Sequence, residues 1–231
     1  MGRILLIRHG QASWGKKDYD VLSPLGMRQS SILGSSLAAR RVHPSVVITG
    51  GLRRQDQTLD AIRGTAGWDQ ITVASDDRWR EYDHQGIITA HKPAYRHMTV
   101  MKADLVRTLR PYRAFMDMFT KAMVRWASGE HDEDYDETFL EFTARVEAAY
   151  TELMDRLGTN ETAVVITSAG PVCWVLTYLL NGDIEHWGRL QIPIVNTSIS
   201  TVRDTKDGPL VEGYNDHAHL VLVDPALATN R

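Results

Sequence analysis

The sequence predicts an α/β fold, a three-layer α/β/α sandwich with a mostly parallel central sheet and a helical insertion. Short apolar, β-branched runs alternate with helical patterns along the first third of the chain, and the last third resumes this alternation. Strands separated by helices are typical of parallel sheets with helices on both faces. The middle shows helical spacing and no strand pattern. We therefore expect a single domain over residues 1–231, with a helical insertion at about 86–157.

The first third supplies three of the expected strands. They share a short, apolar, β-branched composition and lie at residues 4–7, 46–49 and 71–74. The helical patterns between them run from about Met27 to Arg40 and from about Arg53 to Arg63. Gly10 marks a sharp exit from the first strand, and Gly50 and Gly51 mark the exit from the second.

The middle and the end of the chain complete the pattern. Residues 103–127 and 137–157 show helical spacing, and Pro111 should break or kink the first of these stretches. An acidic, Gly-containing loop separates them. The apolar run at 163–168 predicts a strand, and a buried helix follows at 170–180. Two more strands, with an antiparallel edge, are expected near the C-terminal end: SISTV at 198–202 and HLVLV at 219–223.

Length and composition limit the classes of protein to which the chain can belong. With 231 residues, of which 43% are hydrophobic, the chain can bury one large core or one core plus a smaller subdomain. A net charge of -3 gives no electrostatic reason to expect nucleic acid or an anionic membrane as a partner. No apolar run approaches the roughly 20 residues that span a bilayer, and no secretion signal precedes the first strand. The single cysteine, Cys173, excludes an internal disulfide and fits a reducing compartment. We expect a cytoplasmic protein.

Polar side chains follow the predicted strands. Arg8 and His9 end the first strand, Arg53 and Arg54 open the helix after the second, and the turn Ser168–Gly170 follows a later one. Ligands of open α/β sheets bind beyond the carboxyl ends of the strands, and a helix N-terminus favours an anion. A polar pair at a half-exposed strand end needs no special purpose. Guanidinium groups from two loops, a helix N-terminus and a glycine turn together predict a phosphate pocket.

Ordered motifs cover nearly the whole chain: RHGQ at 8–11, LSPLGMRQS at 22–30, LRRQDQT at 52–58, RWREYDHQG at 78–86, DETFLEFTARVEAAY at 136–150, NTSISTV at 196–202 and YNDHAHL at 214–220. This set resembles the histidine phosphatase superfamily, the phosphoglycerate mutase-like proteins. The resemblance implies phosphoryl transfer through a phosphohistidine. It implies neither a metal nor another cofactor.

The resemblance also implies a role for each residue of the expected site. His9 would be the nucleophile that attacks phosphorus, and Arg8 and Arg54 would spread their charge over the phosphate oxygens. Glu81 would protonate the leaving oxygen and then activate water. Gln11 would donate to a phosphate oxygen or to the substrate. Imidazole suits the nucleophile because it can be neutral and nucleophilic near neutral pH. The expected partner is a phosphorylated small molecule.

One position departs from the family's pattern. The turn after the strand at 163–168 reads TSAGP, so Ala169 stands between Ser168 and Gly170 where the family usually has a histidine of the phosphate pocket. Losing one such donor costs on the order of 10²–10³ in rate. Three explanations stay open: a natural small residue, an engineered substitution, or a member that binds phosphate without turning it over. His84 is the first candidate to fill the gap, since it follows Glu81 by three residues and would share its face if that segment were helical.

Three functions are compatible with these motifs. The leading one is a phosphomonoester hydrolase that acts through phosphohistidine and is weakened by Ala169. The second is a phosphoglycerate mutase-type phosphotransferase, for which Arg107, Arg110 and Arg113 in the insertion offer basic contacts. The third is a non-catalytic protein that binds a phosphorylated ligand. A homodimer is compatible with the sequence, and the motifs do not encode the leaving group of the substrate.

Overall fold

The structure is a computed structural model that describes residues 2–13 and 20–230. It divides into two compact units. The first is formed by the chain up to Glu81 and from Arg145 onwards, and the second is formed by Tyr82–Ala144. The first unit contains a sheet between helices, whereas the described elements of the second are helical. Each unit has its own architecture and is described by itself.

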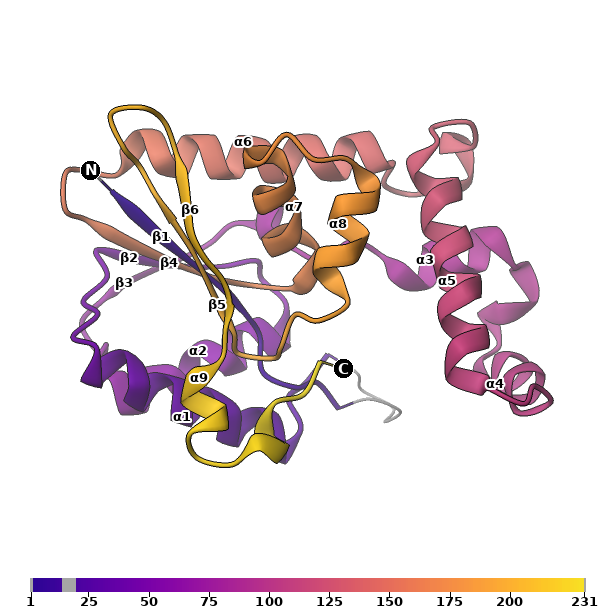
Figure 1. Cartoon of the computed structure of the whole chain (residues 1–231), viewed down its shortest axis with the longest axis horizontal. Helices are drawn as coiled ribbons and strands as arrows, with labels where there is room; N and C mark the ends of the chain where they lie inside the picture. The colour runs from indigo at the N-terminus through magenta and orange to yellow at the C-terminus, as the bar shows by residue number, and fades with distance from the viewer. Residues whose placement is uncertain (1, 14–19, 231) are drawn as a thin grey trace. The chain divides into compact units, whose positions relative to one another are not determined.

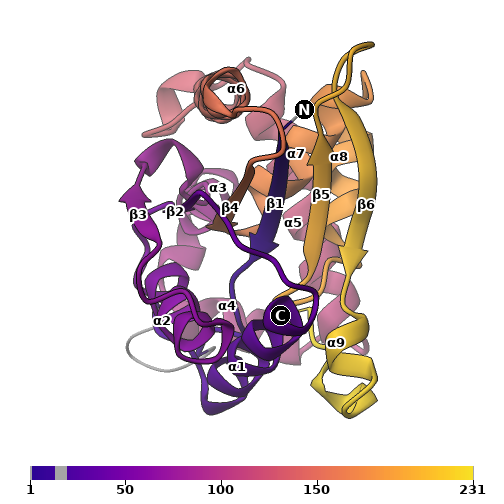
Figure 2. The ribbon, with the colours of Figure 1, turned by 90° about the vertical axis from the view of Figure 1, so that its left-hand side faces the viewer.

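The described part of the first unit contains one sheet of six strands (Figure 1). The strands, in chain order, are β1 Arg3–Arg8, β2 Val46–Thr49, β3 Thr72–Ser75, β4 Thr162–Thr167, β5 Ile199–Arg203 and β6 Leu210–Asp216. Their spatial order is β3-β2-β4-β1-β5-β6, which Figure 2 shows from one end of the sheet. The first four in this order run parallel, whereas β5 is antiparallel to β1 and β6 is antiparallel to β5. The predicted α/β fold with a mostly parallel sheet is confirmed.

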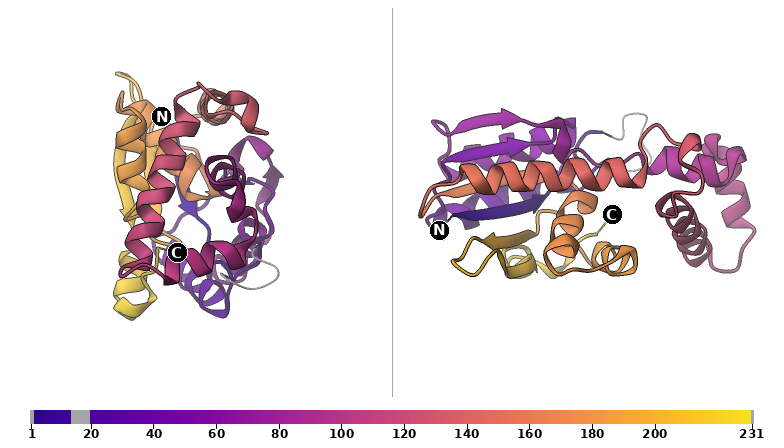
Figure 3. Two further views of the ribbon diagram at one scale, coloured as in Figure 1. Left: turned by 90° about the vertical axis from the view of Figure 1, so that its right-hand side faces the viewer. Right: turned by 90° about the horizontal axis from the view of Figure 1, so that it is seen from above.

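Helices cover both faces of the sheet. On one face, α1 (Pro24–Ala39) and α2 (Arg53–Ala66) pack against each other (Figure 1). On the other face lie residues 145–156 of α6 (Phe139–Arg156), together with α7 (Ala169–Leu179) and α8 (Ile184–Gln191) (Figure 1). Seen from above, this part of α6 runs along the sheet, with α7 and α8 beside it (Figure 3, right). The sheet and these helices form the three predicted layers.

The second unit ends inside α6. Residues 145–156, the later part of this helix, belong to the first unit. There Arg145 donates hydrogen bonds to the carbonyl oxygens of Arg78 and Arg80, each at 2.7 Å. The insertion expected at about 86–157 therefore extends beyond the second unit, because helical spacing alone does not reveal where one long helix changes its partners.

The central strands are buried on both faces. In β1, Leu5 and Ile7 pack in the apolar cluster formed with α1 and α2, while Ile4 and Leu6 point to the opposite face because successive side chains of a strand alternate. All four are at most 5% exposed. A strand that is covered on both faces consists of a continuous apolar run, which is why ILLI predicts its strand so clearly.

On the first face, α1 begins and α2 ends at residues that favour a helix terminus. Ser23 caps α1, since its hydroxyl accepts a hydrogen bond from the N–H of Gly26 at 3.0 Å. Pro24 follows at the first helical position, where the missing N–H has no intrahelical partner to lose. The helix α2 ends at Ala66 and is capped by Gly67, whose φ of 71° is the left-handed conformation that glycine adopts without strain.

The C-terminal end differs from the prediction. The sequence predicts a strand at 219–223, but the structure has a short helix there, α9 (Ala218–Val221), so the prediction is wrong. Leu220 is buried whereas Leu222 is 86% exposed, so this apolar run does not belong to a covered strand. The last strand is β6 instead, which pairs with β5. Its signal is the pair Asp207-Gly208, a typical hairpin turn, in which Gly208 has a φ of 106°.

The second unit contains α3 (His84–His91), α4 (Met98–Val106), α5 (Pro111–Ala127) and the first part of α6. Pro111 is the first residue of α5, so the proline divides the expected helical stretch into two helices, as predicted. Thr138 caps α6 within a capping box: its N–H donates to the Glu141 carboxylate at 2.8 Å, and the Glu141 N–H donates to its hydroxyl at 3.2 Å.

Short 3-10 turns complete the described elements: Asp77–Trp79, Pro93–Arg96, Asp132–Asp134 and Pro225–Leu227. Among the helices of residues 2–13 and 20–230, none combines the length and the apolar character that a membrane span requires.

Candidate active site at the carboxyl ends of the strands

The carboxyl ends of β1, β2 and β4 meet at one edge of the sheet. β4 lies between the other two and runs parallel to both, and Arg8 at the end of β1 is opposite Thr167 at the end of β4. The segments that leave these strands begin at His9, Gly50 and Ser168, so they emerge side by side. This edge is where open α/β sheets bind their ligands.

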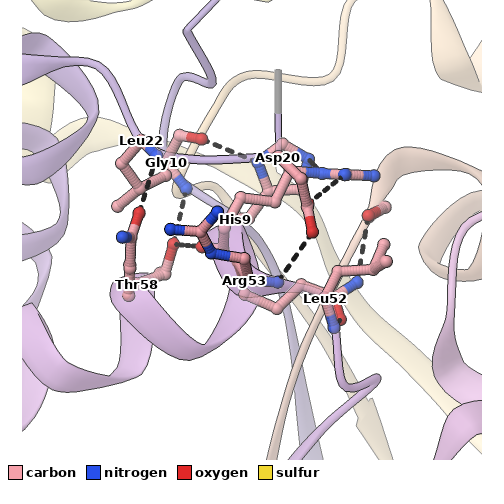
Figure 4. Close-up of polar contacts among 11 residues, drawn as sticks. His9, Gly10, Asp20, Leu22, Leu52, Arg53 and Thr58 are labelled. Carbon is pink, nitrogen blue, oxygen red and sulfur yellow. Dashed lines mark hydrogen bonds and ion pairs between the residues drawn. The ribbon is translucent and has the colours of Figure 1, made fainter. Parts of the chain in front are cut away.

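His9 is the first residue after β1 and is 4% exposed. Its N–H donates to the carbonyl oxygen of Thr167 at 2.8 Å. Its Nδ1 atom lies 2.7 Å from the carbonyl oxygen of Gly10, and its Nε2 atom lies 3.1 Å from Nε of Arg54 (Figure 4). Because a carbonyl oxygen can only accept and an arginine Nε can only donate, the proton is on Nδ1 and the lone pair is on Nε2.

The charge state of His9 follows from its surroundings. Burial lowers the pKa of His9 well below its ordinary value, and the guanidinium groups of Arg54 and Arg8 lower it further. The hydrogen bond to Gly10 acts in the opposite direction with a smaller effect. At neutral pH the ring is therefore a neutral imidazole, with a lone pair on the nitrogen that faces Arg54.

Arg54 reaches the imidazole from the first turn of α2. It is 5% exposed, whereas its neighbour Arg53 is exposed, so Arg54 is the one of the two arginines that belongs to the site. One turn later, Thr58 accepts a hydrogen bond from the N–H of Gly10 at 3.0 Å and donates to the carbonyl oxygen of Arg54 at 2.7 Å (Figure 4). Thr58 thus joins the loop after β1 to the helix that carries Arg54.

Glu81 lies at the turn that follows β4. The N–H of Gly170 donates to its Oε2 atom at 3.3 Å. In the same turn Ser168 is fully buried, and its hydroxyl accepts from Nε2 of Gln55 in α2 at 3.1 Å. Ala169 is the first residue of α7. The turn where a family histidine is expected therefore holds the Glu81 carboxyl group against the N-terminus of α7.

Arg8 completes the group of charged residues at this edge. It is 8% exposed, and its NH1 atom donates to the carbonyl oxygen of Ile194 at 2.6 Å. Burial raises the pKa of the Cys173 thiol, the charge of Glu81 raises it further and that of Arg8 lowers it. The structure thus brings Arg8, His9, Arg54 and Glu81 to one edge of the sheet.

The side-chain amide of Gln11 makes two hydrogen bonds. Its Oε1 atom accepts from the hydroxyl of Ser23 at 2.9 Å, and its Nε2 atom donates to the hydroxyl of Thr229 at 3.3 Å. The amide therefore joins the cap of α1 to the C-terminal segment. The expected donation from Gln11 to a phosphate oxygen stays a prediction.

His84 belongs to the second unit, where it is the first residue of α3. Glu81 precedes that helix and is the last residue of the first unit before Tyr82. The idea that one helical segment gives Glu81 and His84 a common face is wrong, because the helix begins only at His84. A role for His84 in the phosphate pocket stays a prediction.

Sequence reasoning missed the residues that hold the backbone of His9. Thr197 is buried and has a φ of 61°, a left-handed conformation that is rare for a β-branched residue. Its N–H donates to the carbonyl oxygen of Arg8 at 3.0 Å, and its hydroxyl lies 3.2 Å from Nε2 of His219. Asn196 donates to the carbonyl oxygen of His9 at 3.3 Å. The motif NTSISTV contains both residues, but its letters do not encode a positive φ.

Asp20 is a second residue that the sequence does not single out. Its Oδ1 atom accepts from NH1 of Arg54 at 2.6 Å, and its Oδ2 atom accepts from the N–H of Arg53 at 3.0 Å (Figure 4). The Asp20 side chain is 33% exposed, compared with 7% for Arg54. It follows no strand and lies outside every motif of the family pattern, so no sequence signal marks it.

These groups offer a neutral imidazole nitrogen, two guanidinium groups and a carboxyl group, which together suit the binding of a phosphate and attack on it. Across residues 2–13 and 20–230, no three His, Cys, Asp or Glu side chains lie together in an arrangement that could hold a metal ion.

A mostly parallel sheet between helices, with a histidine and two arginines at its carboxyl edge, defines an α/β protein with a candidate anion site. The profile of the histidine phosphatase superfamily (branch 1) matches residues 4–97 and 109–217. The chain belongs to this superfamily. Its members include phosphatases and phosphoglycerate mutases, as the relatives below illustrate.

Two curated relatives are mutases. Phosphoglycerate mutase 1 of Saccharomyces cerevisiae is 31% identical over 86 residues, which cover 35% of this chain and 34% of the relative. The 2,3-bisphosphoglycerate-dependent phosphoglycerate mutase of Rhizobium etli is 31% identical over 90 residues, which cover 36% of this chain and 42% of the relative. The similarity to each of these proteins therefore spans less than half of its length.

Solved structures with the same fold match almost the whole chain. YhfR of Bacillus stearothermophilus has a TM-score of 0.66 at 20% identity, covering 94% of this chain and 99% of that one. A mutant phosphoserine phosphatase of Entamoeba histolytica in complex with phosphoserine has a TM-score of 0.65 at 16% identity, covering 95% and 100%. The mycobacterial glucosyl-3-phosphoglycerate phosphatase has a TM-score of 0.63 at 19% identity, covering 92% and 98%. At these identities the likeness establishes the fold.

Proposed function

We propose that this protein is a phosphomonoester hydrolase that acts through a phosphohistidine on His9. The observation that carries the proposal is the state of the imidazole, which is neutral and has its lone pair on the Nε2 atom that faces Arg54. A neutral ring nitrogen can attack phosphorus without first losing a proton. Membership of the histidine phosphatase superfamily supports the same chemistry.

In the first step, Nε2 of His9 bonds to phosphorus and the ester P–O bond breaks. The leaving oxygen takes the proton of the Glu81 carboxyl group, so the alcohol departs and Glu81 becomes a carboxylate. Arg8 and Arg54 stabilise the charge on the equatorial phosphate oxygens. The ring becomes positively charged when Nε2 bonds to phosphorus, and the Gly10 carbonyl oxygen stabilises this charge through the Nδ1 proton.

In the second step, water attacks phosphorus and gives a proton to the Glu81 carboxylate. The N–P bond breaks, inorganic phosphate departs, and His9 returns to the neutral ring while Glu81 regains its proton. Two transfers of moderate difficulty thus replace one difficult transfer. The substrate in this proposal is a phosphorylated small molecule, and the setting is the cytoplasm, in keeping with the single cysteine.

A phosphoglycerate mutase-type phosphotransferase is the second candidate, because the two curated relatives are mutases. It shares the first step and then returns the phosphoryl group to another oxygen of the substrate. These relatives match over only 35% and 36% of this chain, so we rank hydrolysis first. A protein that binds phosphate without turnover is the third candidate, since Ala169 lacks the donor of the family's histidine.

Trapping ³²P on the protein from a generic phosphate donor tests the proposal. We expect an acid-labile label in the wild type and no label in the His9→Ala variant. A wild type that takes no label while it binds inorganic phosphate supports the non-catalytic candidate. Product analysis then separates the other two, because a hydrolase releases inorganic phosphate and a mutase yields a substrate phosphorylated at another oxygen.

A further inference from the structure

The carboxylate of Asp20 bridges two donors of the candidate site. It accepts from NH1 of Arg54 at 2.6 Å and from the N–H of Arg53 at 3.0 Å (Figure 4). Arg53 is the first residue of α2, so its N–H belongs to the helix N-terminus, where a negative charge is favoured. Asp20 therefore binds one arginine and one helix N-terminus, which are the two kinds of donor that phosphate groups prefer.

The same arginine belongs to the proposed phosphate site. Arg54 also donates from Nε to Nε2 of His9 at 3.1 Å, so its guanidinium group is next to the atom that attacks phosphorus in the proposed mechanism. A phosphoryl group in line with Nε2 must contact the guanidinium group that Asp20 contacts. Two negative groups on one guanidinium repel each other, so each weakens the binding of the other.

A hydrolase also has to release its product. Arg8 and Arg54 are 8% and 5% exposed, and two buried guanidinium groups attract inorganic phosphate as well as a phosphate ester. Slow product release limits the turnover of many enzymes. A carboxylate within the site opposes this attraction without adding a bond to the ester or to the leaving group.

We propose that Asp20 sets the phosphate affinity of this site. By pairing with Arg54, it weakens the binding of inorganic phosphate and speeds its release. This inference rests on the proposed phosphohistidine function, since it assumes that phosphate binds beside His9 and Arg54.

A purely structural role for Asp20 makes a different prediction. Leu52, at the N-cap of α2, has no side-chain oxygen, and Asp20 supplies an acceptor to the helix N-terminus instead. The Asp20→Asn variant separates the two roles, because the amide oxygen keeps an acceptor for the Arg53 N–H, while the negative charge and the acceptor that faces Arg54 are lost. A structural role predicts that this variant binds phosphate as the wild type does.

Isothermal titration with inorganic phosphate at pH 7 tests the inference. We expect the Kd of Asp20→Asn to be at least fivefold lower than that of the wild type, a factor that corresponds to about 1 kcal/mol, the repulsion of two unit charges about 4 Å apart in bulk water. Product inhibition by phosphate should strengthen by the same factor. The matched control is Asp60→Asn, which removes the same charge from an exposed position of α2 and should bind phosphate within twofold of the wild type.

An affinity for phosphate that is unchanged or weaker in Asp20→Asn overturns the inference, and a weaker one means that Asp20 orients Arg54. Asp20→Ser keeps a hydroxyl acceptor and should tighten phosphate binding in the same way, which covers the case of a misfolded Asn variant. An unchanged affinity together with a normal ³²P label defeats the inference alone. If neither the wild type nor these variants bind phosphate or take the label, the proposed function fails with it.

Discussion

Nε of Arg54 donates a hydrogen bond to Nε2 of His9 at 3.1 Å, on the side of the ring opposite the Nδ1 atom that Gly10 holds. This bond occupies the lone pair that attacks phosphorus in the proposed mechanism. A substrate phosphate that draws Arg54 to its own oxygens therefore releases the nucleophile at the same moment. In the proposed mechanism the arginine would have two roles, because it would protect the lone pair in the absence of an anion and stabilise the phosphate when one binds.

Arg54→Lys should lower kcat/KM toward an aryl phosphate by about 10²–10³, the range found when one preorganised donor is lost. Lysine keeps the charge but cannot donate to two oxygens in a fork. The control is Arg53→Lys, whose side chain is exposed and which should keep nearly full activity. Steady-state kinetics measure both variants. Equal losses in the two would mean that the buried guanidinium is not the phosphate ligand.

Glu81→Gln should slow the enzyme because an amide cannot protonate the leaving oxygen. A general acid contributes typically about 10²–10⁴ in rate. Aryl phosphates have good leaving groups and need little protonation, so they should lose less activity than alkyl phosphates. Comparing kcat for one substrate of each kind in the variant and the wild type measures this difference. If both substrates lose the same factor, Glu81 has another role than that of an acid.

Ala169→His tests whether the turn after β4 faces the phosphate. If the pocket has room for an imidazole, the variant should gain a donor and become faster by about 10²-fold. If another group already fills that space, the added ring should clash and lower the activity. The chemical rate is measured by single-turnover kinetics, with Ala169→Ser as a control of small volume. A rate that does not change at all would mean that this turn does not contribute to the phosphate pocket.

The stability of the first unit should decrease in mild acid because of His219. Burial lowers the pKa of His219 to about 4, whereas an unfolded histidine has a pKa of about 6.5. Between these values the unfolded chain binds a proton that the folded protein does not, so the free energy of unfolding falls as the pH decreases from about 6.5 to about 4. The difference between the two pKa values corresponds to about 3 kcal/mol.

Urea unfolding at pH 7 and pH 4.5 measures this effect. The buried His9, whose pKa is also lowered, contributes with the same sign, so the comparison needs a variant. In His219→Gln the loss of stability between the two pH values should be smaller than in the wild type. The same loss in both proteins would assign the pH dependence to other groups.

The sequence predicts most clearly the strands that are buried on both faces, although it also predicts the exposed edge strand β3. The runs that form β1 and β4 are continuously apolar because helices cover both sides of these strands. The strand β6 was missed because it lies at the sheet edge and is only partly buried, so its residues show no continuous apolar run. The run at 219–223 is apolar although part of it is exposed, as Leu222 shows. Its composition therefore predicts a strand where the structure has the helix α9.

The residues of the candidate site also differ in whether the sequence predicts them. Arg8, His9 and Arg54 follow strands or open a helix, so topology alone predicts that they meet. Asp20 and Thr197 depend on contacts between segments far apart in the chain and, for Thr197, on a backbone conformation with a φ of 61°. Neither kind of information is present in spacing or hydrophobic periodicity. Such residues are identified only from the side-chain contacts and backbone angles of the structure.

The boundary between the two units has a consequence for changes in chain length. Residues 82–144 form one continuous stretch that begins directly after Glu81, while Arg8, His9 and Arg54 lie far from it along the chain. Every strand lies outside this stretch, so a change in its length leaves the order and the register of the strands as they are. Glu81 is then the one residue of the proposed chemistry that adjoins the junction, so a change in the length of this stretch has to leave the acid in place.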